Sequence, residues 1–238
     1  MNRAPGPTGS APEAPPDCPL CPRLAAFRRE NRKRYPDFHN DPVPSFGPRD
    51  ARLLVVGLAP GLKGANRTGR PFTGDHAGAL LYATLLACGF AEGRYEARPD
   101  DGLRLRDARI ANAVRCVPPE NKPTPDEIVT CRRFLEATLA EMPRLRAVVA
   151  LGRIAHDSVL ACFGLKRADY PFAHGAVHAP AGRPGLFDSY HCSRQNTNTG
   201  RLTPEMFRAV FEAARTHIGC ASSQSTTSSA FRSGGNTG

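Results

Sequence analysis

The sequence predicts an α/β fold, a three-layer α/β/α sandwich with a central, mostly parallel four-stranded sheet. Three observations lead to this prediction. Apolar runs of strand length alternate along the chain with segments of helix length. The runs are almost continuously apolar, as in strands that are covered on both faces. The chain has 238 residues, 40% of them hydrophobic, which is enough for one well-buried domain.

Each expected strand is a short apolar run. Residues 52–58 read RLLVVGL, residues 108–116 read ARIANAVRC and residues 146–152 read RAVVALG. A weaker fourth run, GLFDSYH, occupies residues 185–191. The alternation with helices favours parallel pairing, because each helix carries the chain back to the start of the next strand.

Four helices are expected between and after these strands, at residues 76–89, 124–143, 153–164 and 203–219. Two of them open with Thr-Pro, in which a capping side chain precedes a proline at the first helical position. Thr124 and Glu127 also have the spacing of a capping box. No internal repeat is present, so residues 17–220 are expected to form a single domain.

Both ends of the chain differ from this domain in composition. Residues 1–16 are rich in Pro, Ala and Gly, and residues 221–238 are rich in Ser, Thr and Gly. Neither end has the apolar content to offset the entropy of ordering it, so both are expected to be disordered tails. No run approaches the ~18 apolar residues that cross a bilayer, and the start lacks the core of a signal peptide. We therefore expect a cytoplasmic protein with no membrane partner.

The charge balance is strongly basic. Lys and Arg number 32 against 22 Asp and Glu, the formal net charge is +10, and 28 of the 32 basic residues are arginine. A basic surface attracts polyanions, which indicates a nucleic-acid partner. Genomic base composition is an alternative source of part of the arginine excess.

A glycine-rich segment follows the first expected strand. Residues 57–74, GLAPGLKGANRTGRPFTG, hold five glycines and two prolines. In open parallel sheets ligands bind beyond the carboxyl ends of the strands, and glycines let a ligand approach main-chain amides. The spacing fits neither the P-loop nor the dinucleotide fingerprint G-x-G-x-x-G. The segment is therefore either another kind of ligand-binding loop or simply a long glycine-rich loop.

The cysteines include four with the spacing of a metal site. A reducing cytosol disfavours disulfides for the eight cysteines, which leaves metal ligation or plain burial. Four thiolates from a CxxC pair and two neighbouring elements can hold either a tetrahedral zinc ion or a [4Fe-4S] cluster. The candidate ligands are Cys18, Cys21, Cys116 and Cys131. The remaining cysteines are expected to be buried thiols, and unrelated burial is the alternative for these four as well.

Two segments closely resemble the signature motifs of the family 5, or type b, uracil-DNA glycosylases. They are GLAPGLKGANRTGRPFTGDHAG at residues 57–78 and HCSRQNTNTGRLT at residues 191–203. The four cysteines match the spacing of the [4Fe-4S] ligands in families 4 and 5, and the similarity runs from Cys18 to about Ile218. Family 4 members carry an acidic residue in G-E-A-P-G, whereas this chain reads G-L-A-P-G, with Ala59 and no acid, which is the family 5 pattern.

The resemblance implies a uracil-DNA glycosylase-like fold with a structural [4Fe-4S] cluster and no other cofactor. It implies a monofunctional, monomeric enzyme that binds DNA, flips out uracil and other deaminated bases such as hypoxanthine and xanthine, and hydrolyses the bond to the sugar. An abasic site remains for base excision repair, and DNA binding places the protein at the nucleoid.

The resemblance also assigns the residues that bind the base. Phe72 is the expected stacking surface, although an aromatic residue fits an ordinary core position equally well. The amide of Asn112 complements the O4 and N3–H edge of uracil, and a structural hydrogen bond is its alternative role. The backbone of Gly57, Ala59 and Gly61 is expected to contact the base or a phosphate.

Two residues are the expected catalytic groups. His191 would donate from a neutral imidazole to O2 and stabilise the negative charge of the departing base. Asp75 would orient the hydrolytic water and screen positive charge on the sugar, and it also fits a plain helix N-cap.

A polar loop follows His191. Arg194, Gln195 and Asn196 are expected to fill the gap left by the flipped nucleotide and to bind the flanking phosphates, or else to form only a solvated loop. Three other functions fit some of these features: a family 4-like uracil-specific glycosylase, a non-catalytic protein that binds damaged DNA, and a zinc-stabilised nucleotide-binding module.

Overall fold

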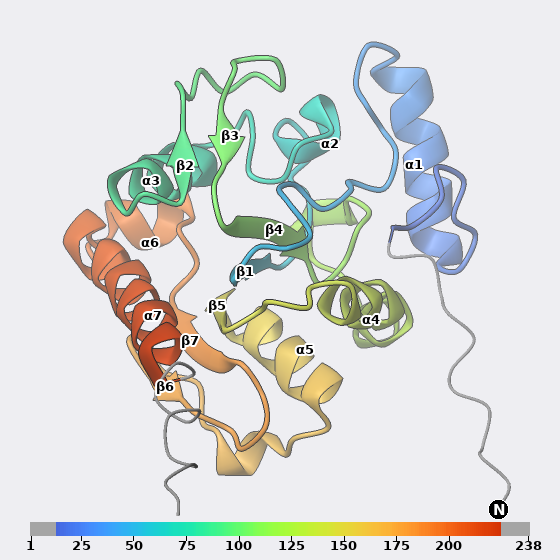
Figure 1. The fold of residues 1–238 in the computed structure, drawn as a ribbon. Helices are drawn as coiled ribbons and strands as arrows, with labels where there is room; N and C mark the ends of the chain where they lie inside the picture. Colours follow the sequence, from blue (N-terminus) through green and yellow to red (C-terminus); the bar gives the residue numbers. More distant parts are fainter. Residues whose placement is uncertain (1–12, 225–238) are drawn as a thin grey trace, which may run out of the picture.

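A computed structural model describes residues 13–224 of the chain, with side chains described up to residue 219. At its centre lies a sheet with the strand order β4-β1-β5-β7-β6 (Figure 1). The strands are β1 (Leu53–Gly57), β4 (Ala108–Asn112), β5 (Ala147–Leu151), β6 (Val177–His178) and β7 (Gly185–Ser189). The three-layer α/β/α prediction is confirmed.

The four predicted strands are all present, and they pair in parallel through β4, β1, β5 and β7. The sheet has a fifth strand that the sequence did not predict, because the two-residue β6 is too short to leave a pattern. It pairs antiparallel at the edge beside β7. The carboxyl ends of the four parallel strands therefore share one edge of the sheet.

Helices cover both faces of the sheet. Figure 1 shows α3 and α7 on one side and α4 and α5 on the other. These helices are α3 (His76–Ala87), α4 (Pro125–Ala140), α5 (Arg153–Phe163) and α7 (Pro204–Gln224). All four were predicted, and α7 continues four residues beyond the expected domain end at residue 220. The rest of the two expected tails, residues 1–12 and 225–238, lies outside the described residues.

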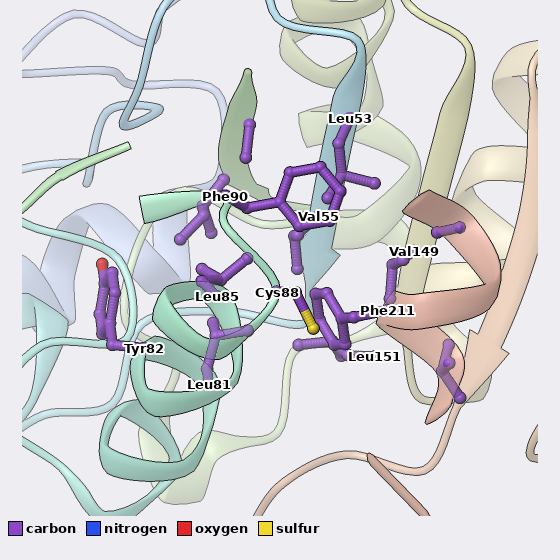
Figure 2. Close-up of a cluster of buried hydrophobic side chains, with 14 of the residues drawn as sticks. Leu53, Val55, Leu81, Tyr82, Leu85, Cys88, Phe90, Val149, Leu151 and Phe211 are labelled. Carbon is purple, nitrogen blue, oxygen red and sulfur yellow. The ribbon is translucent and has the colours of Figure 1, made fainter. Parts of the chain in front are cut away.

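The covered faces explain the continuous apolar runs. Along β1, Leu53 and Val55 pack into the core cluster under α3 and α7 (Figure 2). Leu54 and Val56 pack into the second cluster under α4 and α5. All five residues of β1 are buried, so neither face of the strand tolerates a polar side chain.

The two Thr-Pro helix starts are as predicted. The Thr124 hydroxyl accepts from the Glu127 amide at 3.3 Å, and the Glu127 carboxylate accepts from the Thr124 amide at 2.8 Å. The Thr203 hydroxyl likewise accepts from the Met206 amide at 3.2 Å. These caps satisfy amides that have no partner within the helix.

Three further helices were not predicted: α1 (Pro22–Arg34), α2 (Ala65–Thr68) and α6 (Arg194–Asn198). The first is too polar for a clear apolar face, and the other two are about one turn long. A small hairpin of β2 (Ala91–Glu92) and β3 (Arg104–Leu105) stands beside α3. No helix within residues 13–224 is long and apolar enough to cross a membrane.

Candidate active site

A cleft of about 530 Å³ opens beyond the carboxyl ends of β1 and β4, whose last residues, Gly57 and Asn112, pair with each other. Most of the residues singled out in the sequence meet there. The predicted residues that line the cleft are Ala59, Gly61, Phe72, Asp75, Asn112, His191, Arg194 and Gln195. Of the expected base-contacting and DNA-contacting residues, Gly57 and Asn196 are not among the lining residues.

Gly57 lies beside the cleft, packed against two residues that line it. A Cβ atom on this residue would lie 2.5 Å from Cζ of Phe72 and 2.5 Å from Oδ1 of Asn112. Real Cβ atoms essentially never come so close to another heavy atom. The bare backbone at this position therefore admits the Phe72 ring and the Asn112 amide to the end of the strand, and through them it shapes the cleft.

Phe72 forms one wall of the cleft. Its side chain is 7% exposed, and its ring centroid lies 6.0 Å from that of His191, with the ring planes 30° apart. The backbone has φ of 53°, in the left-handed region that costs a non-glycine residue roughly 1–2 kcal/mol. Contacts outside the cleft must hold the residue in this conformation.

Asn112 carries an unpaired polar atom. It is the last residue of β4 and 2% exposed, yet its Oδ1 atom is buried without a hydrogen-bond partner in the described structure. Most buried polar atoms have a partner, because an unpaired one loses its hydrogen bonds to water. The amide is therefore prepared for a ligand that brings an N–H group into the cleft.

Asp75 has the capping role that the sequence allowed, and its second oxygen points elsewhere. It is the N-cap of α3, and its Oδ1 accepts from the amide of Gly78 at 3.2 Å. The other oxygen, Oδ2, lies against the glycine-rich segment, where a Cβ atom on Gly61 would be 3.2 Å away and one on Gly64 would collide with it. One oxygen caps the helix, and the other faces the loop that lines the cleft.

His191 lies two residues beyond β7, which ends at Ser189 and not at His191 as the sequence suggested. Burial lowers the pKa of its imidazole from 6.5, and the negative charge of Asp75 opposes this shift to a lesser extent. The ring is therefore neutral at neutral pH. A neutral imidazole has one N–H to donate and one nitrogen to accept.

The segment after His191 is a helix and not the expected loop. The Ser193 hydroxyl caps α6 by accepting from the amide of Asn196 at 3.4 Å. Arg194 and Gln195 are exposed and line the cleft. Asn196 instead donates from Nδ2 to the carbonyl oxygen of His191 at 2.8 Å, which holds the backbone of that residue.

Six cleft residues were not singled out in the sequence: Leu58, Ala65, His76, Ala77, Asn121 and Ser193. Leu58 takes the place of the acid in G-E-A-P-G. Asn121 is an exposed amide at the end of a 3-10 turn, and both it and Glu120 have positive φ. The only signal for Asn121 is its place in the proline-rich run VPPENKP, directly after Cys116.

The four candidate metal ligands come together beside the cleft. They belong to one apolar cluster, in which Cys18, Cys116 and Cys131 are buried and Cys21 is partly buried. Ala59 of the cleft wall packs against the same cluster. The four cysteines converge from the segment that leads into α1, the segment that follows β4, and α4.

Nitrogen donors surround the sulfur atoms. The buried Arg28 guanidinium donates to Cys116 Sγ at 3.6 Å, and the backbone amide of Arg115 donates to Cys131 Sγ at 3.2 Å. Burial raises the pKa of the Cys116 thiol to about 12, and the neighbouring Cys131 adds to the shift. Donors and a buried cation beside four sulfurs fit an anionic thiolate-bound metal centre.

The spacing of the sulfurs bears on the kind of metal centre. A zinc ion with sulfur ligands at 2.3 Å holds them about 3.8 Å apart. Among the described residues, no three cysteine sulfurs lie within 4.8 Å of one another, since the only group of three potential ligands that close contains no cysteine. The four sulfurs are therefore spaced more widely than the ligands of one zinc ion.

That one compact group is His156, His178 and Asp188. His156 Nδ1 lies 2.7 Å from Asp188 Oδ1, and His178 Nε2 lies 3.1 Å from Oδ2. His156 also contacts the carbonyl oxygen of Tyr170 through Nε2, at 2.9 Å. These are direct hydrogen-bond distances, so the group ties α5, β6 and β7 together as a buried polar network.

Comparisons with known proteins agree with this geometry. The model of the uracil DNA glycosylase superfamily matches residues 44–215. A type-5 uracil-DNA glycosylase of Thermus thermophilus is 50% identical over 203 residues, covering 83% of this chain and 92% of the relative. One of Pyrobaculum aerophilum is 42% identical over 208 residues, covering 86% and 90%. A type-4 uracil-DNA glycosylase of Archaeoglobus fulgidus is 34% identical over 137 residues, covering 57% and 61%.

The similarity to the type-5 proteins spans nearly the whole described fold, whereas the similarity to this type-4 protein covers little more than half of the chain. The matched range includes the glycine-rich segment, the end of β4 and the segment after β7. The chain belongs to the uracil-DNA glycosylase superfamily and, within it, to the type-5 uracil-DNA glycosylases.

Proposed function

We propose that this protein is a uracil-DNA glycosylase that removes uracil from DNA by hydrolysis and leaves an abasic site. One observation carries the proposal: an aromatic wall, an unpaired buried amide oxygen, a carboxylate and a neutral imidazole share one cleft at the carboxyl edge of the sheet. A base-excising enzyme needs these four elements, since it must hold a flipped base and hydrolyse its bond to the sugar.

Phe72 and Asn112 would hold the base. Uracil flipped out of the duplex would stack on the Phe72 ring, which is already in place in the free protein. Its N3–H would donate to the unpaired Oδ1 of Asn112, and its O4 would accept from the amide nitrogen. Pairing that buried oxygen recovers the hydrogen bond that it lacks in the free protein, so the contact favours bases with an N–H at this edge.

His191 and Asp75 would carry out the chemistry. The bond between N1 of uracil and C1′ of the sugar breaks, and its electron pair leaves with the base. A neutral His191 donates to O2 as negative charge builds there, a type of contact worth roughly 10²- to 10³-fold in rate. The free oxygen of Asp75 orients a water whose oxygen bonds to C1′, and it takes up the proton that this water loses.

The exposed residues around the cleft would bind the DNA backbone. Arg194 and Gln195 lie at the rim, on the first turn of a helix that is fixed to His191 through Asn196. The formal net charge of +10 adds a general attraction to phosphates. This part of the proposal predicts that binding weakens steeply as salt increases.

The proposal includes a [4Fe-4S] cluster held by Cys18, Cys21, Cys116 and Cys131. The four buried or partly buried thiols, the N–H donors beside them and their wide spacing support it. When bound, the cluster would supply a covalent link between the start of α1, the end of β4 and α4, with no part in the reaction. Because Ala59 packs against these cysteines, that link also supports the cleft wall.

We extend the proposal to hypoxanthine and xanthine, to a monomeric enzyme and to a place at the nucleoid in the cytoplasm. Leu58 stands where the family 4 motif has an acid, so that position carries no charged group tuned to one base. The rim residues, the cleft and the proposed catalytic groups all come from a single chain.

The test is a base-release assay on duplexes that carry one uracil, hypoxanthine or xanthine. The purified protein is incubated with each duplex, and alkali then cleaves the strand at any abasic site. We expect cleavage at uracil, none in a thymine duplex, and about hundredfold slower cleavage at uracil with an Asp75→Asn protein purified in parallel. Binding to the uracil duplex without base release would instead identify a non-catalytic DNA-binding protein.

A further inference from the structure

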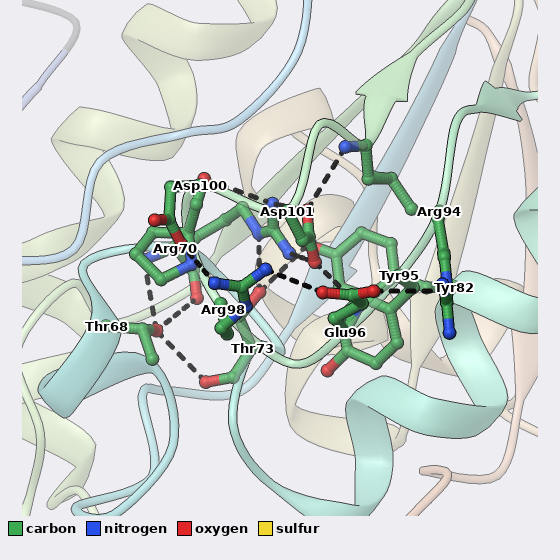
Figure 3. A network of polar contacts seen from close by, with 12 residues as sticks. Thr68, Arg70, Thr73, Tyr82, Arg94, Tyr95, Glu96, Arg98, Asp100 and Asp101 are labelled. Atoms are coloured by element: carbon green, nitrogen blue, oxygen red, sulfur yellow. Dashed lines mark hydrogen bonds and ion pairs between the residues drawn. The ribbon is translucent and has the colours of Figure 1, made fainter.

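A buried ion pair joins Arg70, two residues before Phe72 in the chain, to Asp101 (Figure 3). Arg70 is 5% exposed, and the side chain of Asp101 is fully buried. Their contact is bidentate, with Nη1 donating to Oδ1 at 2.8 Å and Nη2 donating to Oδ2 at 2.7 Å. The hydrogen bonds from Arg70 hold the pKa of the Asp101 carboxyl well below its usual range. Neither residue lines the cleft.

Arg70 reaches across the turn to the residue beyond Phe72. Its Nε donates to the hydroxyl of Thr73 at 2.7 Å. This hydrogen bond closes the turn that contains Pro71 and Phe72. The same group lies over the rings of Tyr82 and Tyr95, at 5.3 and 5.8 Å from their centroids. Cation–π contacts of this kind hold a buried guanidinium in one orientation.

The two tyrosines fix the main chain of the turn. The hydroxyl of Tyr82 donates to the carbonyl oxygen of Pro71 at 2.7 Å, and that of Tyr95 donates to the carbonyl oxygen of Phe72 at 3.2 Å. These are the carbonyls on either side of the left-handed Phe72 backbone. The tyrosine hydroxyls therefore oppose relaxation of the turn to an ordinary conformation.

Asp101 holds Tyr95 as well as Arg70. Its Oδ2 accepts from the amide of Glu96, the residue after Tyr95, at 2.9 Å, and its Oδ1 accepts from the amide of Leu103 at 3.1 Å. One carboxylate thus connects the segment between β2 and β3 to the glycine-rich segment. Its loss would release Arg70 and Tyr95 together.

We propose that Asp101, with Arg70 and Tyr95, is a positioning device that holds the Phe72 ring ready to stack the flipped base. The inference rests on the proposed function, because only a base-excising enzyme would stack a flipped base on the Phe72 ring. Preorganisation of this kind matters because a displacement of about 1 Å at a reacting site can cost about 10²-fold in rate. Asp101 acts through Phe72 and touches neither the base nor the sugar.

A double-mutant cycle tests the device in single-turnover uracil excision. We expect Asp101→Asn to lower the rate about tenfold when Phe72 is present and less than about twofold in the Phe72→Ala background. A purely structural role would give the same factor in both backgrounds and would overturn the proposal, as would a folded Asp101→Asn protein with the wild-type rate.

The matched control is Asp107→Asn. Asp107 also binds an arginine, accepting from Nε of Arg52 at 2.6 Å, but it does so at the opposite end of β1 from the cleft. Its variant should leave the excision rate unchanged. Because Asp101→Asn leaves the buried Arg70 guanidinium without its counter-ion and can prevent folding, Tyr95→Phe is the second variant, and it removes a single hydroxyl.

A crystal structure of the Tyr95→Phe protein without DNA separates this inference from the proposed function. We expect the Phe72 carbonyl to turn and the ring to move away from Gly57, a result that needs no activity. An unmoved ring would overturn the positioning role even if the protein excises uracil. A wild-type protein that releases no uracil would overturn the proposed function alone.

Discussion

Asp75 divides its two carboxylate oxygens between a helix and the cleft. One accepts from the amide of Gly78 at the start of α3, and the other faces the glycine-rich segment. The capping role alone would explain the residue, which is why the sequence left both roles open. The two roles can be separated, because asparagine caps a helix about as well as aspartate but cannot take up a proton from water.

Asp75→Asn should therefore lower the rate of uracil excision about hundredfold and leave the thermal unfolding temperature nearly unchanged. Thr124→Asn is the control, because it makes a comparable cap exchange on α4 at a residue that does not line the cleft. Single-turnover rates and unfolding curves of both variants check the prediction. An Asp75→Asn protein with the wild-type rate would remove the carboxylate from the mechanism.

His191 links the chemistry to the pH dependence of stability. Burial places its pKa in the folded protein below the value of 6.5 that it has when unfolded. Between the two values the unfolded chain binds more protons, so stability rises with pH. Above pH 6.5 the imidazole is neutral in both states and does not lower the free energy of unfolding. As the pH falls from 6.5 toward the pKa in the folded protein, that free energy decreases.

The thermal unfolding temperature of the wild-type protein should therefore fall between pH 7.5 and pH 5.5, and it should fall less in His191→Gln, which has no imidazole to protonate. Unfolding curves at several pH values measure the difference. The prediction fails if the two proteins lose the same number of degrees over this range.

At the scale of elements, the cleft lies beside the point where the end of β1 packs most closely against its neighbours. Gly57 ends β1 against the Phe72 ring and the Asn112 amide, with no room for a Cβ atom beside either. The strand end, the turn of the glycine-rich segment and the end of β4 therefore form one tightly packed unit. A single methyl group at residue 57 should displace the ring or the amide.

Gly57→Ala should give a folded protein whose excision rate is reduced at least about hundredfold. Gly219→Ala is the control, because a Cβ atom at this exposed position of α7 meets nothing within 4 Å. Circular dichroism and single-turnover rates would be compared. If Gly57→Ala excised uracil at the wild-type rate, the packing described for this strand end would be wrong.

The main strands and helices could be predicted because their patterns are strong. A run such as RLLVVGL has no exposed face, and Thr-Pro marks a helix start through a local hydrogen bond. By contrast the sequence predicts a loop at α6, because its residues, RQNTN, have no apolar periodicity. The stability of this helix depends on the Ser193 cap and on the contact with His191.

Prediction of the cleft depended on motifs and not on periodicity. Phe72, Asp75 and His191 stand in segments with a recognisable pattern, and the structure brings them together. Asn121 stands in a turn of irregular backbone with positive φ. Asp101 lies 31 residues along the chain from Arg70, its partner in the ion pair. Pairings of that kind come from tertiary packing, which leaves no local signal.

At the scale of the molecule, the cysteine cluster and the cleft share one wall. Ala59 lines the cleft and also packs against the cysteines, which join three separate parts of the chain. The helix α1 has few apolar residues of its own to dock it, and Leu24 is its only side chain in that cluster. Metal binding would supply the missing stabilisation.

Cys116→Ala should lose iron and acid-labile sulfide and unfold at a markedly lower temperature, since folding and cluster binding are coupled. Cys162→Ala is the control, because Cys162 lies on α5 outside that cluster. Iron and sulfide analysis with unfolding curves would check both proteins. A Cys116→Ala protein that kept its metal, its stability and its activity would contradict the cluster assignment.

The most direct test of the whole account is a crystal structure with duplex DNA that carries 2′-fluoro-2′-deoxyuridine, whose glycosidic bond resists hydrolysis. We expect the uracil outside the helix, stacked on Phe72, with N3–H at Asn112 Oδ1, O2 at His191 and a water held by Asp75. A uracil that remained paired in the duplex, or that bound away from these four residues, would contradict the account.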